Sequence, residues 1–264
     1  MTTEYRANPA ISATAIKAGA RSMKHMHHAM TCQREPTAAM AWGTLVHAAL
    51  FLPDPFRVWL DRKAGKAWNA FEGDALAAGK IVVKPHELDK LQSLKESIAA
   101  NQEAQDALHA GRTYEEPVLW VDPVAGNSKA LPDAYGSGVL VDLKTAAKID
   151  ERNFTLASWA MGYHLQLAWY RRGLRFTGKP VDRVGIVAVE SAAPFDVCLY
   201  WFDPALLDFA EGECLRITTA YRLCEKSGIF PGAHPFARTL LQPAYADEQV
   251  QGVPDEELDP SLID

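Results

Sequence analysis

The chain has 264 residues, is 48% hydrophobic and carries a formal net charge of −6. This length and composition suffice for a large buried core. No apolar run approaches the roughly 20 residues that a membrane-spanning helix needs, and the N-terminal "MTTEYRANPAIS" lacks the basic and then apolar order of a secretory signal. We therefore expect a soluble, cytoplasmic protein without a membrane partner.

The negative charge is concentrated near the C-terminus. No Lys or Arg follows Arg238, whereas seven Asp and Glu residues lie between 243 and 264, so the preceding part of the chain is nearly neutral. Because nucleic-acid affinity depends on where Lys and Arg meet phosphates, the net charge does not exclude a DNA partner. We expect residues 1–242 to form one domain that begins with helices, and residues 243–264 to form a flexible acidic tail. Such a tail either solubilises the protein or contacts a basic partner.

Hydrophobic periodicity and turn residues predict helices in the first half of the chain. An Ala-rich stretch begins after Ser12, a residue type that often caps helices, and a second apolar stretch precedes a polar loop with a short helix. A Leu-rich stretch with helical spacing then ends at Gly111. These elements cover residues 11–30, 37–52, 54–79 and 84–111.

Strands predominate after residue 114. Three short strands separated by turn residues are typical of an antiparallel meander, and a crossover helix, two further strands and a last helix follow. Strands interleaved with helices predict an α/β fold with a mixed sheet flanked by helices. The meander covers residues 115–122, 128–135 and 138–144, and the later elements cover 151–174, 183–191, 195–203 and 204–228.

Two acids and a lysine lie in and before the apolar strand "GVLVDLK". Alternation places Asp142 and Lys144 on one face of this strand, and antiparallel pairing brings Asp133 near Asp142. Two adjacent carboxylates repel each other unless a cation lies between them, and Mg²⁺ and Mn²⁺ prefer oxygen ligands. The other interpretation is an exposed Asp–Lys ion pair. Because Asp-x-Lys is a short and common string, the residues alone favour the ion pair.

The order of several motifs resembles that of the RecE-type exodeoxyribonucleases, which are phage-derived members of the PD-(D/E)XK nuclease superfamily. "LPD" with "VDLK" looks like the superfamily motif. "WGTLVHAALFLPDPF" resembles the Gly-Thr-x-x-His helix of the family, and "GYHLQLAWYRRGL" resembles its Gln-x-x-x-Tyr helix. The similarity extends from about residue 11 to residue 232, and this extent favours a metal site over a surface ion pair.

The resemblance implies a restriction-endonuclease-like fold and a metal-dependent active site. Mg²⁺ is the implied cofactor, with Mn²⁺ as a possible substitute. Lys144 would orient or activate the attacking water and stabilise the developing charge. The implied metal ligands are His47, Asp133, Asp142 and the backbone carbonyl of Leu143.

The resemblance leaves one ligand open and has one departure. The family places an acid five residues before an aromatic residue, which here selects Glu115 before Trp120 as an outer ligand of the metal or its water. A solvated strand end is an equal alternative for Glu115. Leu131 stands where related sequences usually carry a basic residue. Asp142 occupies a position that is often Glu, and either carboxylate binds metal.

Two further groups of residues are expected to contact DNA. Gln166 and Tyr170 share a helix face and belong, by the resemblance, to the catalytic site, where they would position the scissile strand. Phosphate contacts by charge are expected from the basic residues of "DRKAGK", which are Arg62, Lys63 and Lys66.

The activity implied by the resemblance is 5'-to-3' digestion of linear double-stranded DNA. The 3' overhangs would serve recombination through a single-strand annealing partner, and the enzyme would be a homo-oligomeric ring around the DNA. Two alternatives stay open. One is an endonuclease or single-strand-preferring nuclease of the same superfamily, and the other is a non-catalytic DNA-binding or assembly protein.

Overall fold

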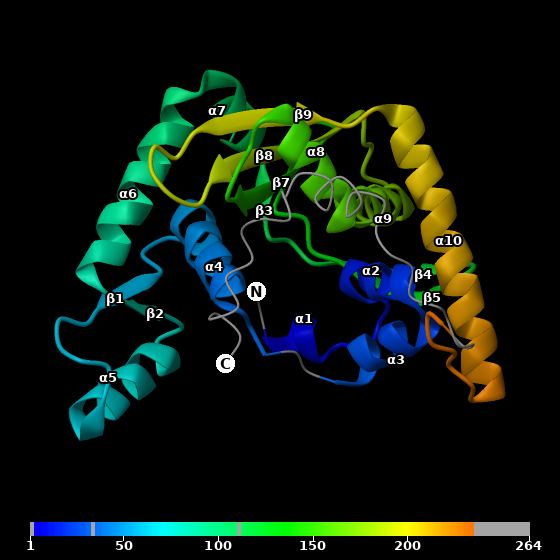
Figure 1. Ribbon diagram of the computed structural model, residues 1–264, viewed down its shortest axis with the longest axis horizontal. Helices are drawn as coiled ribbons and strands as arrows, with labels where there is room; N and C mark the ends of the chain where they lie inside the picture. Colours follow the sequence, from blue (N-terminus) through cyan, green and yellow to red (C-terminus); the bar gives the residue numbers. More distant parts are fainter. Residues whose placement is uncertain (1–2, 33–34, 110–111, 235–264) are drawn as a thin grey trace, which may run out of the picture.

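A computed structural model describes residues 3–32, 35–109 and 112–234. Its centre is a mixed five-stranded sheet with the order β3-β6-β7-β8-β9 (Figure 1). Strands β6 and β7 pair antiparallel, β7 and β8 pair parallel, and β8 and β9 pair antiparallel. The predicted mixed sheet is therefore confirmed. The strand bounds are β3 Thr113–Tyr114, β6 Ala134–Gly136, β7 Val139–Ala146, β8 Arg183–Glu190 and β9 Val197–Trp201.

Helices cover both faces of this sheet because β7 and β8 bury both of their sides. Val141 and Leu143 of β7 pack into one hydrophobic cluster with α4, α6 and α7, whereas Leu140 packs into another with α2, α9 and α10. The alternation predicted for this strand is confirmed. The helix bounds are α2 Ala13–Arg21, α4 Ala38–Phe51, α6 Pro85–Ala100, α7 Gln102–His109, α9 Tyr163–Phe176 and α10 Pro204–Ser227.

The predicted three-stranded meander is wrong in its first part. Strands β4 (Val118–Asp122) and β5 (Gly126–Ala130) form a separate antiparallel hairpin, and residues 131–133 interrupt the strand expected over 128–135. Pro132 has no N–H to donate to a ladder, so β5 and β6 do not continue into each other. The hairpin packs against α9, where the missing side chain of Gly173 leaves room for the Trp120 ring.

Three helices predicted as continuous are each broken in two. The first breaks at Ser22, whose side chain caps α3 (Met23–Thr31), and the second breaks at Asn101, whose side chain accepts a hydrogen bond from the Ala104 N–H. The third breaks at Gly162, which has a φ of 66°. Capping side chains and a left-handed glycine end helices locally, and hydrophobic periodicity does not register them. The segment before Gly162 is α8 (Glu151–Ala160).

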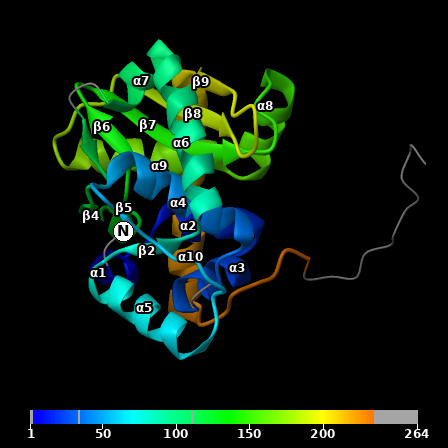
Figure 2. The ribbon, with the colours of Figure 1, turned by 90° about the vertical axis from the view of Figure 1, so that its left-hand side faces the viewer.

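The remaining elements lie between α4 and α6 and at the start of the chain. Strands β1 (Phe56–Val58) and β2 (Ile81–Val83) pair parallel, and α5 (Gly65–Ala77) between them projects away from the five-stranded sheet (Figure 2). Only a loop and a short helix were expected over 54–79. Helix α1 (Thr3–Ala7) precedes α2.

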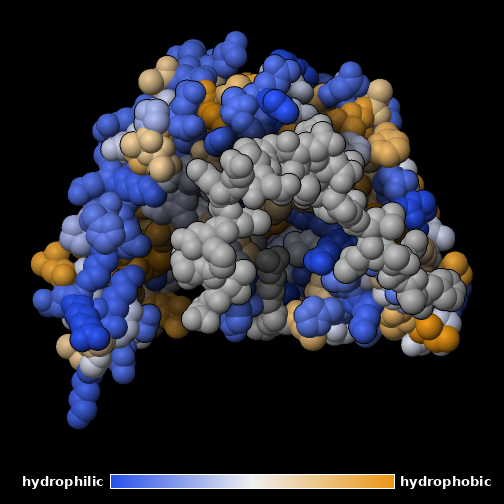
Figure 3. Space-filling model, viewed as in Figure 1, coloured by the Kyte–Doolittle hydropathy of each residue, from blue (hydrophilic) through white to orange (hydrophobic). Residues whose placement is uncertain are grey.

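The surface carries both polar and apolar residues. Figure 3 shows hydrophilic residues along the outer edges of the face seen in Figure 1, with smaller hydrophobic patches between them. Among the described residues, no helix is both long enough and apolar enough to cross a bilayer. The acidic tail predicted over 243–264 lies outside the described residues.

Candidate active site

Strands β6 and β7 bring two acids together. Ala134 pairs with Val141, so Asp133, which directly precedes β6, lies opposite Asp142 of β7. Both residues are buried, with exposed fractions of 8% and 1%. The Asp133 carboxylate accepts a hydrogen bond of 2.7 Å from the Leu143 N–H, across the strand pair. The antiparallel register therefore places two carboxylates side by side inside the protein.

Lys144 lies on the same face of β7 as Asp142. Its ammonium forms an ion pair with the Asp142 carboxylate and lies 5.1 Å from the centre of the Tyr163 ring. The lysine side chain is 17% exposed. The Asp142–Lys144 pair is therefore not a solvated ion pair at a strand edge, because β7 is central in the sheet and both side chains are largely removed from water.

The two acids have opposite shifts in pKa. Burial and the charge of Asp133 raise the pKa of Asp142 to about 6, and the attraction of Lys144 only partly offsets this rise. Burial acts against ionisation of Asp133 too, but the charge and hydrogen bond of His47 outweigh it and lower the pKa of Asp133. Burial alone would lower the pKa of Lys144, yet the two carboxylates raise it to about 12. Burial and the repulsion between the two carboxylates thus oppose the ionisation of Asp142 even with Lys144 beside it.

His47 reaches the acid pair from α4, which packs on the opposite face of β7. Its Nδ1 lies 3.4 Å from Asp133 Oδ1, and its Nε2 lies 3.2 Å from the carbonyl oxygen of Leu143. Both neighbours only accept hydrogen bonds, an arrangement that favours the protonated imidazole. This agrees with its pKa, which burial lowers but Asp133 raises further, for a net rise.

Glu115 lies at the edge of the same cluster. Its Oε1 is 3.9 Å from His47 Nδ1, and its N–H donates to the backbone oxygen of Asp133 at 3.1 Å. Its φ of 45° lies in the left-handed region, which a Glu rarely adopts. The structure therefore holds Glu115 beside the acids in a strained backbone conformation, a feature that often accompanies functional sites.

Gln166 and Tyr170 of α9 close the other side of Asp142. The Gln166 amide donates to Asp142 Oδ1 at 3.0 Å and to the Tyr170 hydroxyl at 3.2 Å. Burial is the largest cause of the raised pKa of Tyr170, which is therefore a neutral phenol. The i, i+4 spacing places both side chains on the helix face that meets β7.

Lys17 joins the site and was missed from the sequence. It lies on α2, and its Nζ donates to Gln166 Oε1 at 3.0 Å, a contact between residues 149 positions apart. Lys17 is the single charged residue between 11 and 20. That isolation in an otherwise apolar helix was the available signal. At position 131, where related sequences usually carry a basic residue, this chain has a buried leucine.

The basic residues expected to contact phosphates lie elsewhere. Arg62, Lys63 and Lys66 are exposed at and before the start of α5, and Lys63 lies 5.6 Å from the centre of the Trp68 ring. Both ribbon views show α5 apart from β7 (Figures 1 and 2). The structure does not bring these three residues to the acid pair.

The donor set suits a hard divalent cation by charge and by atom type. Within the described residues, no three His, Cys, Asp or Glu side chains converge as a formed metal site. In this arrangement Lys144 and Gln166 contact the Asp142 oxygens, while His47 and the Leu143 N–H contact those of Asp133. Two carboxylates and a carbonyl are nevertheless oxygen ligands that Mg²⁺ and Mn²⁺ prefer. The residues fit such an ion once these side chains rearrange.

One solved structure supports the assignment of the fold. A putative exonuclease from Eubacterium rectale superposes with a TM-score of 0.63 at 14% identity, over 96% of this chain and 99% of that chain. An alkaline exonuclease from Laribacter hongkongensis matches less well, with a TM-score of 0.39 at 14% identity over 86% and 98%. A phage related exonuclease from Haemophilus somnus 129PT has a TM-score of 0.36 at 12% identity over 83% and 96%. No curated protein matches the chain significantly.

The family match covers most of the chain. Residues 12–233 match the family described as a PDDEXK-like domain of unknown function (DUF3799). This agrees with the resemblance to RecE-type nucleases, and the predicted membership of the PD-(D/E)XK superfamily is confirmed. Nucleases of this superfamily depend on metal ions. The chain is a member of the PDDEXK-like family DUF3799.

Proposed function

We propose that the protein is a metal-dependent deoxyribonuclease whose active site is the cluster of Asp133, Asp142 and Lys144. The observation that carries this proposal is the pair of buried carboxylates on β6 and β7, one of which has its pKa raised to about 6 beside a lysine. Two buried carboxylates repel each other, and a bound cation relieves that repulsion. The family membership agrees with this chemistry.

The residues that would hold a divalent cation are those already gathered at the acid pair. They are Asp133, Asp142 and the Leu143 carbonyl, with His47 and Glu115 beside them. When bound, Mg²⁺ or Mn²⁺ would supply positive charge that stabilises the transition state of phosphodiester hydrolysis. His47 would have to be neutral to act as a ligand, because a metal-binding imidazole carries no extra proton.

Lys144 acts through its charge. Its pKa of about 12 keeps the ammonium protonated at neutral pH, so it donates hydrogen bonds and does not abstract a proton. An ammonium beside the scissile phosphate orients the attacking water and stabilises the charge that develops on the phosphate oxygens. Gln166 and Tyr170 position the strand, since both are neutral donors held against Asp142.

The proposed substrate is linear double-stranded DNA, digested from 5' to 3' to leave 3' overhangs for recombination. The similarity of motif order to RecE-type enzymes supports this direction, and the Eubacterium rectale protein of the same fold is named a putative exonuclease. The proposal includes a ring-shaped homo-oligomer in the cytoplasm and a single-strand annealing partner, both of which rest on the motif resemblance.

The test is a nuclease assay of the wild type and Asp142→Ala with Mg²⁺, Mn²⁺ and Ca²⁺. The substrates are linear duplexes labelled at the 5' or the 3' end and covalently closed circles. We expect the wild type with Mg²⁺ or Mn²⁺ to release nucleotides first from 5' ends and to leave circles intact. Efficient cutting of circles would instead identify an endonuclease, and no metal-dependent loss of DNA would identify a non-catalytic protein.

A further inference from the structure

Three apolar side chains are exposed together near the C-terminal end of α8. They are Leu156, Trp159 and Met161, with exposed fractions of 63%, 57% and 57%. Leu156 and Trp159 are three positions apart, so they lie on the same face of the helix. Contiguous exposed apolar side chains are typical of interaction sites, whereas single scattered ones are ordinary on protein surfaces.

The indole of Trp159 is already oriented by a neighbour. It stacks on the His164 ring with 4.3 Å between the ring centres and an angle of 9° between the planes. His164 is only 8% exposed, and no hydrogen-bond partner of its buried Nδ1 is found within the described residues, so packing against Trp159 holds this ring. His164 covers one face of the indole, so the exposed area of Trp159 lies on the other face and the edges.

The patch lies at the rim of the candidate active site. The chain turns at Gly162, directly after Met161, and a Cβ at Gly162 would come within 3.1 Å of the Lys17 side chain. The next residue, Tyr163, has its ring 5.1 Å from Lys144 Nζ and 5.8 Å from Lys17 Nζ. The C-terminal end of the patch is therefore followed directly by the two residues, Gly162 and Tyr163, that lie beside Lys17 and Lys144.

The charge around the patch suits a polyanion. From Arg152 to Val181 the sequence contains no Asp or Glu. The acids nearest in sequence, Asp150 and Glu151, lie at the N-terminal end of α8, where the Asp150 side chain caps the helix. Asp150 and Glu151 line a hollow together with Leu156 at that end of the helix. The C-terminal part of α8 and all of α9 present no carboxylate to a nucleic-acid strand that reaches the lysines past Trp159.

We propose that Trp159, flanked by Leu156 and Met161, is a stacking platform for an unpaired nucleobase of the DNA strand that enters the active site. The proposal rests on the proposed nuclease function and adds a feature of the substrate, which is a base released from its pair beside the cleaved phosphate. An aromatic platform accepts any base, because every base has a π face. A pre-oriented ring also loses little conformational freedom when it binds.

The test measures binding of single-stranded DNA in an Asp142→Asn background, in which the strand is not consumed. Fluorescence anisotropy compares an oligothymidylate with an abasic oligonucleotide of the same length. Stacking is worth about 1–3 kcal/mol per base, so Trp159→Ala should bind the oligothymidylate about tenfold more weakly and the abasic strand equally well. Trp159→Phe should bind nearly as well as the parent. Phe209→Ala, which removes an aromatic side chain that is 55% exposed on α10, should change neither affinity.

Three outcomes would overturn the platform. The first is an equal loss of affinity for both oligonucleotides in Trp159→Ala, and the second is an unchanged affinity of this variant for oligothymidylate. The third is an oligomer that dissociates in sedimentation when Trp159 is replaced by Ala, which would assign the patch to a second copy of the chain. The binding assay needs no hydrolysis. An inactive wild type would therefore refute the nuclease and not the platform, whereas unchanged binding beside an active wild type would refute only the platform.

Discussion

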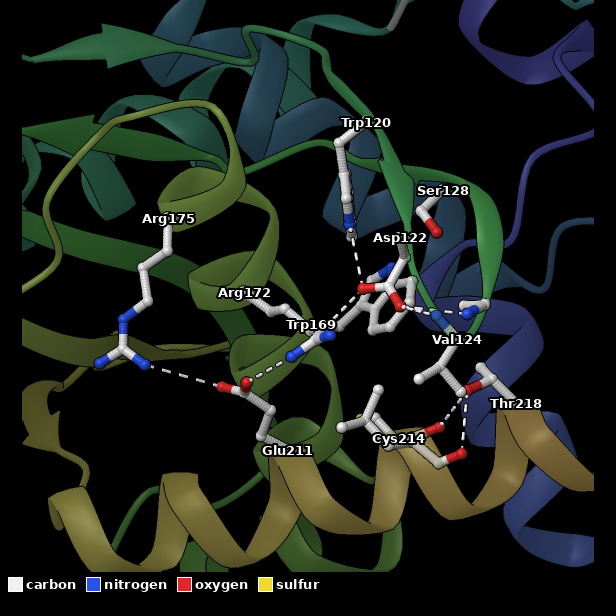
Figure 4. A network of polar contacts seen from close by, with 12 residues as sticks. Trp120, Asp122, Val124, Ser128, Trp169, Arg172, Arg175, Glu211, Cys214 and Thr218 are labelled. Carbon is white, nitrogen blue, oxygen red and sulfur yellow. Dashed lines mark hydrogen bonds and ion pairs between the residues drawn. The ribbon is translucent and has the colours of Figure 1, made fainter.

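Helix α9 contributes to two buried clusters of charge that differ in whether the pKa of the buried acid is lowered or raised. In one, Asp122 accepts hydrogen bonds from Arg172 at 2.6 Å and from two backbone N–H groups at 2.9 and 3.0 Å (Figure 4). In the other, Asp142 faces a second carboxylate. Burial raises the pKa of both acids, but the hydrogen bonds of Asp122 outweigh it and lower that pKa, whereas the pKa of Asp142 rises to about 6.

The difference separates an acid that holds the fold together from one that is available for chemistry. Arg172 also pairs with Glu211 at 2.8 Å, so the network ties the β4–β5 hairpin, α9 and α10 to one another (Figure 4). Each charge in that network has a partner. At the acid pair, burial and the neighbouring carboxylate oppose the ionisation of Asp142, which fits a site that binds a cation and a reacting phosphate.

The largest expected effect is the loss of activity in Asp142→Asn. The variant keeps the shape of the side chain but removes one carboxylate, so nuclease activity should fall on the order of 10³-fold. Its thermal midpoint should stay close to that of the wild type, because repulsion with Asp133 disappears together with the Lys144 ion pair. Asp196→Asn, at an exposed acid, is the control. If Asp142→Asn showed no cooperative unfolding transition, Asp142 would be required for folding. That result would contradict the separation of the two clusters.

The reverse result is expected for Asp122→Asn. This change leaves the Arg172 guanidinium without its buried carboxylate partner, and breaking such a pair costs about 3 kcal/mol. Chemical denaturation should show this loss as a lower midpoint. Activity per folded molecule should be unchanged at a temperature where the variant is folded. A large drop in kcat with normal stability would place Asp122 in the active site instead.

Two substitutions of Lys144 test whether a positive charge beside Asp142 is sufficient for activity. Lys144→Met should lower kcat about 100-fold, since it removes one group that stabilises the transition state. Lys144→Arg keeps the charge but has a different shape, and it should retain more activity than the methionine variant. Equal activity of the two variants would show that the positive charge is not what matters.

Metal binding should stabilise the folded protein only while the acid pair is intact. A ligand at 100 times its Kd stabilises by about 2.7 kcal/mol, which raises the thermal midpoint of a protein of this size by roughly 5 to 10 °C. Differential scanning fluorimetry with Mg²⁺ or Mn²⁺ should show this rise for the wild type and for Asp122→Asn measured from its own lower midpoint. Asp142→Asn should respond weakly. An equal rise in all three proteins would indicate a metal site elsewhere.

The smallest effect is on acid stability. Because the pKa of Asp122 is lowered by folding, its contribution is present above the ordinary value of 3.8 and is lost as the pH falls through the lower value in the folded state. Stability of the wild type should therefore fall more steeply below pH 4 than that of Asp122→Asn. Urea midpoints between pH 2 and pH 5 measure the slopes. If stability changed with pH by the same slope in both proteins, the pKa of Asp122 would be the same in the folded and the unfolded state.

The motifs allowed much of the candidate site to be predicted, because each motif is local. Strand alternation predicted that Asp142 and Lys144 share a face, and helix spacing predicted the same for Gln166 and Tyr170. Their catalytic roles stay predictions. Lys17 was not predicted, since its contact with Gln166 spans 149 positions and depends on how α2 packs against α9. The phosphate contacts expected of the "DRKAGK" residues were predicted from charge alone. Charge does not determine the direction in which α5 projects, so the distance of these residues from the acid pair could not be predicted.

By itself, the sequence determined the family, the helix and strand periodicities and the identity of the acid pair, since these depend on residue types and spacings along the backbone. Only the tertiary structure decided that the Asp142–Lys144 pair is buried and not solvated, and that β4 and β5 leave the sheet. It also decided that the pKa of Asp122 is lowered whereas that of Asp142 is raised. Burial, desolvation and pairing of charges depend on elements that are distant in sequence, so they arise only when the chain packs.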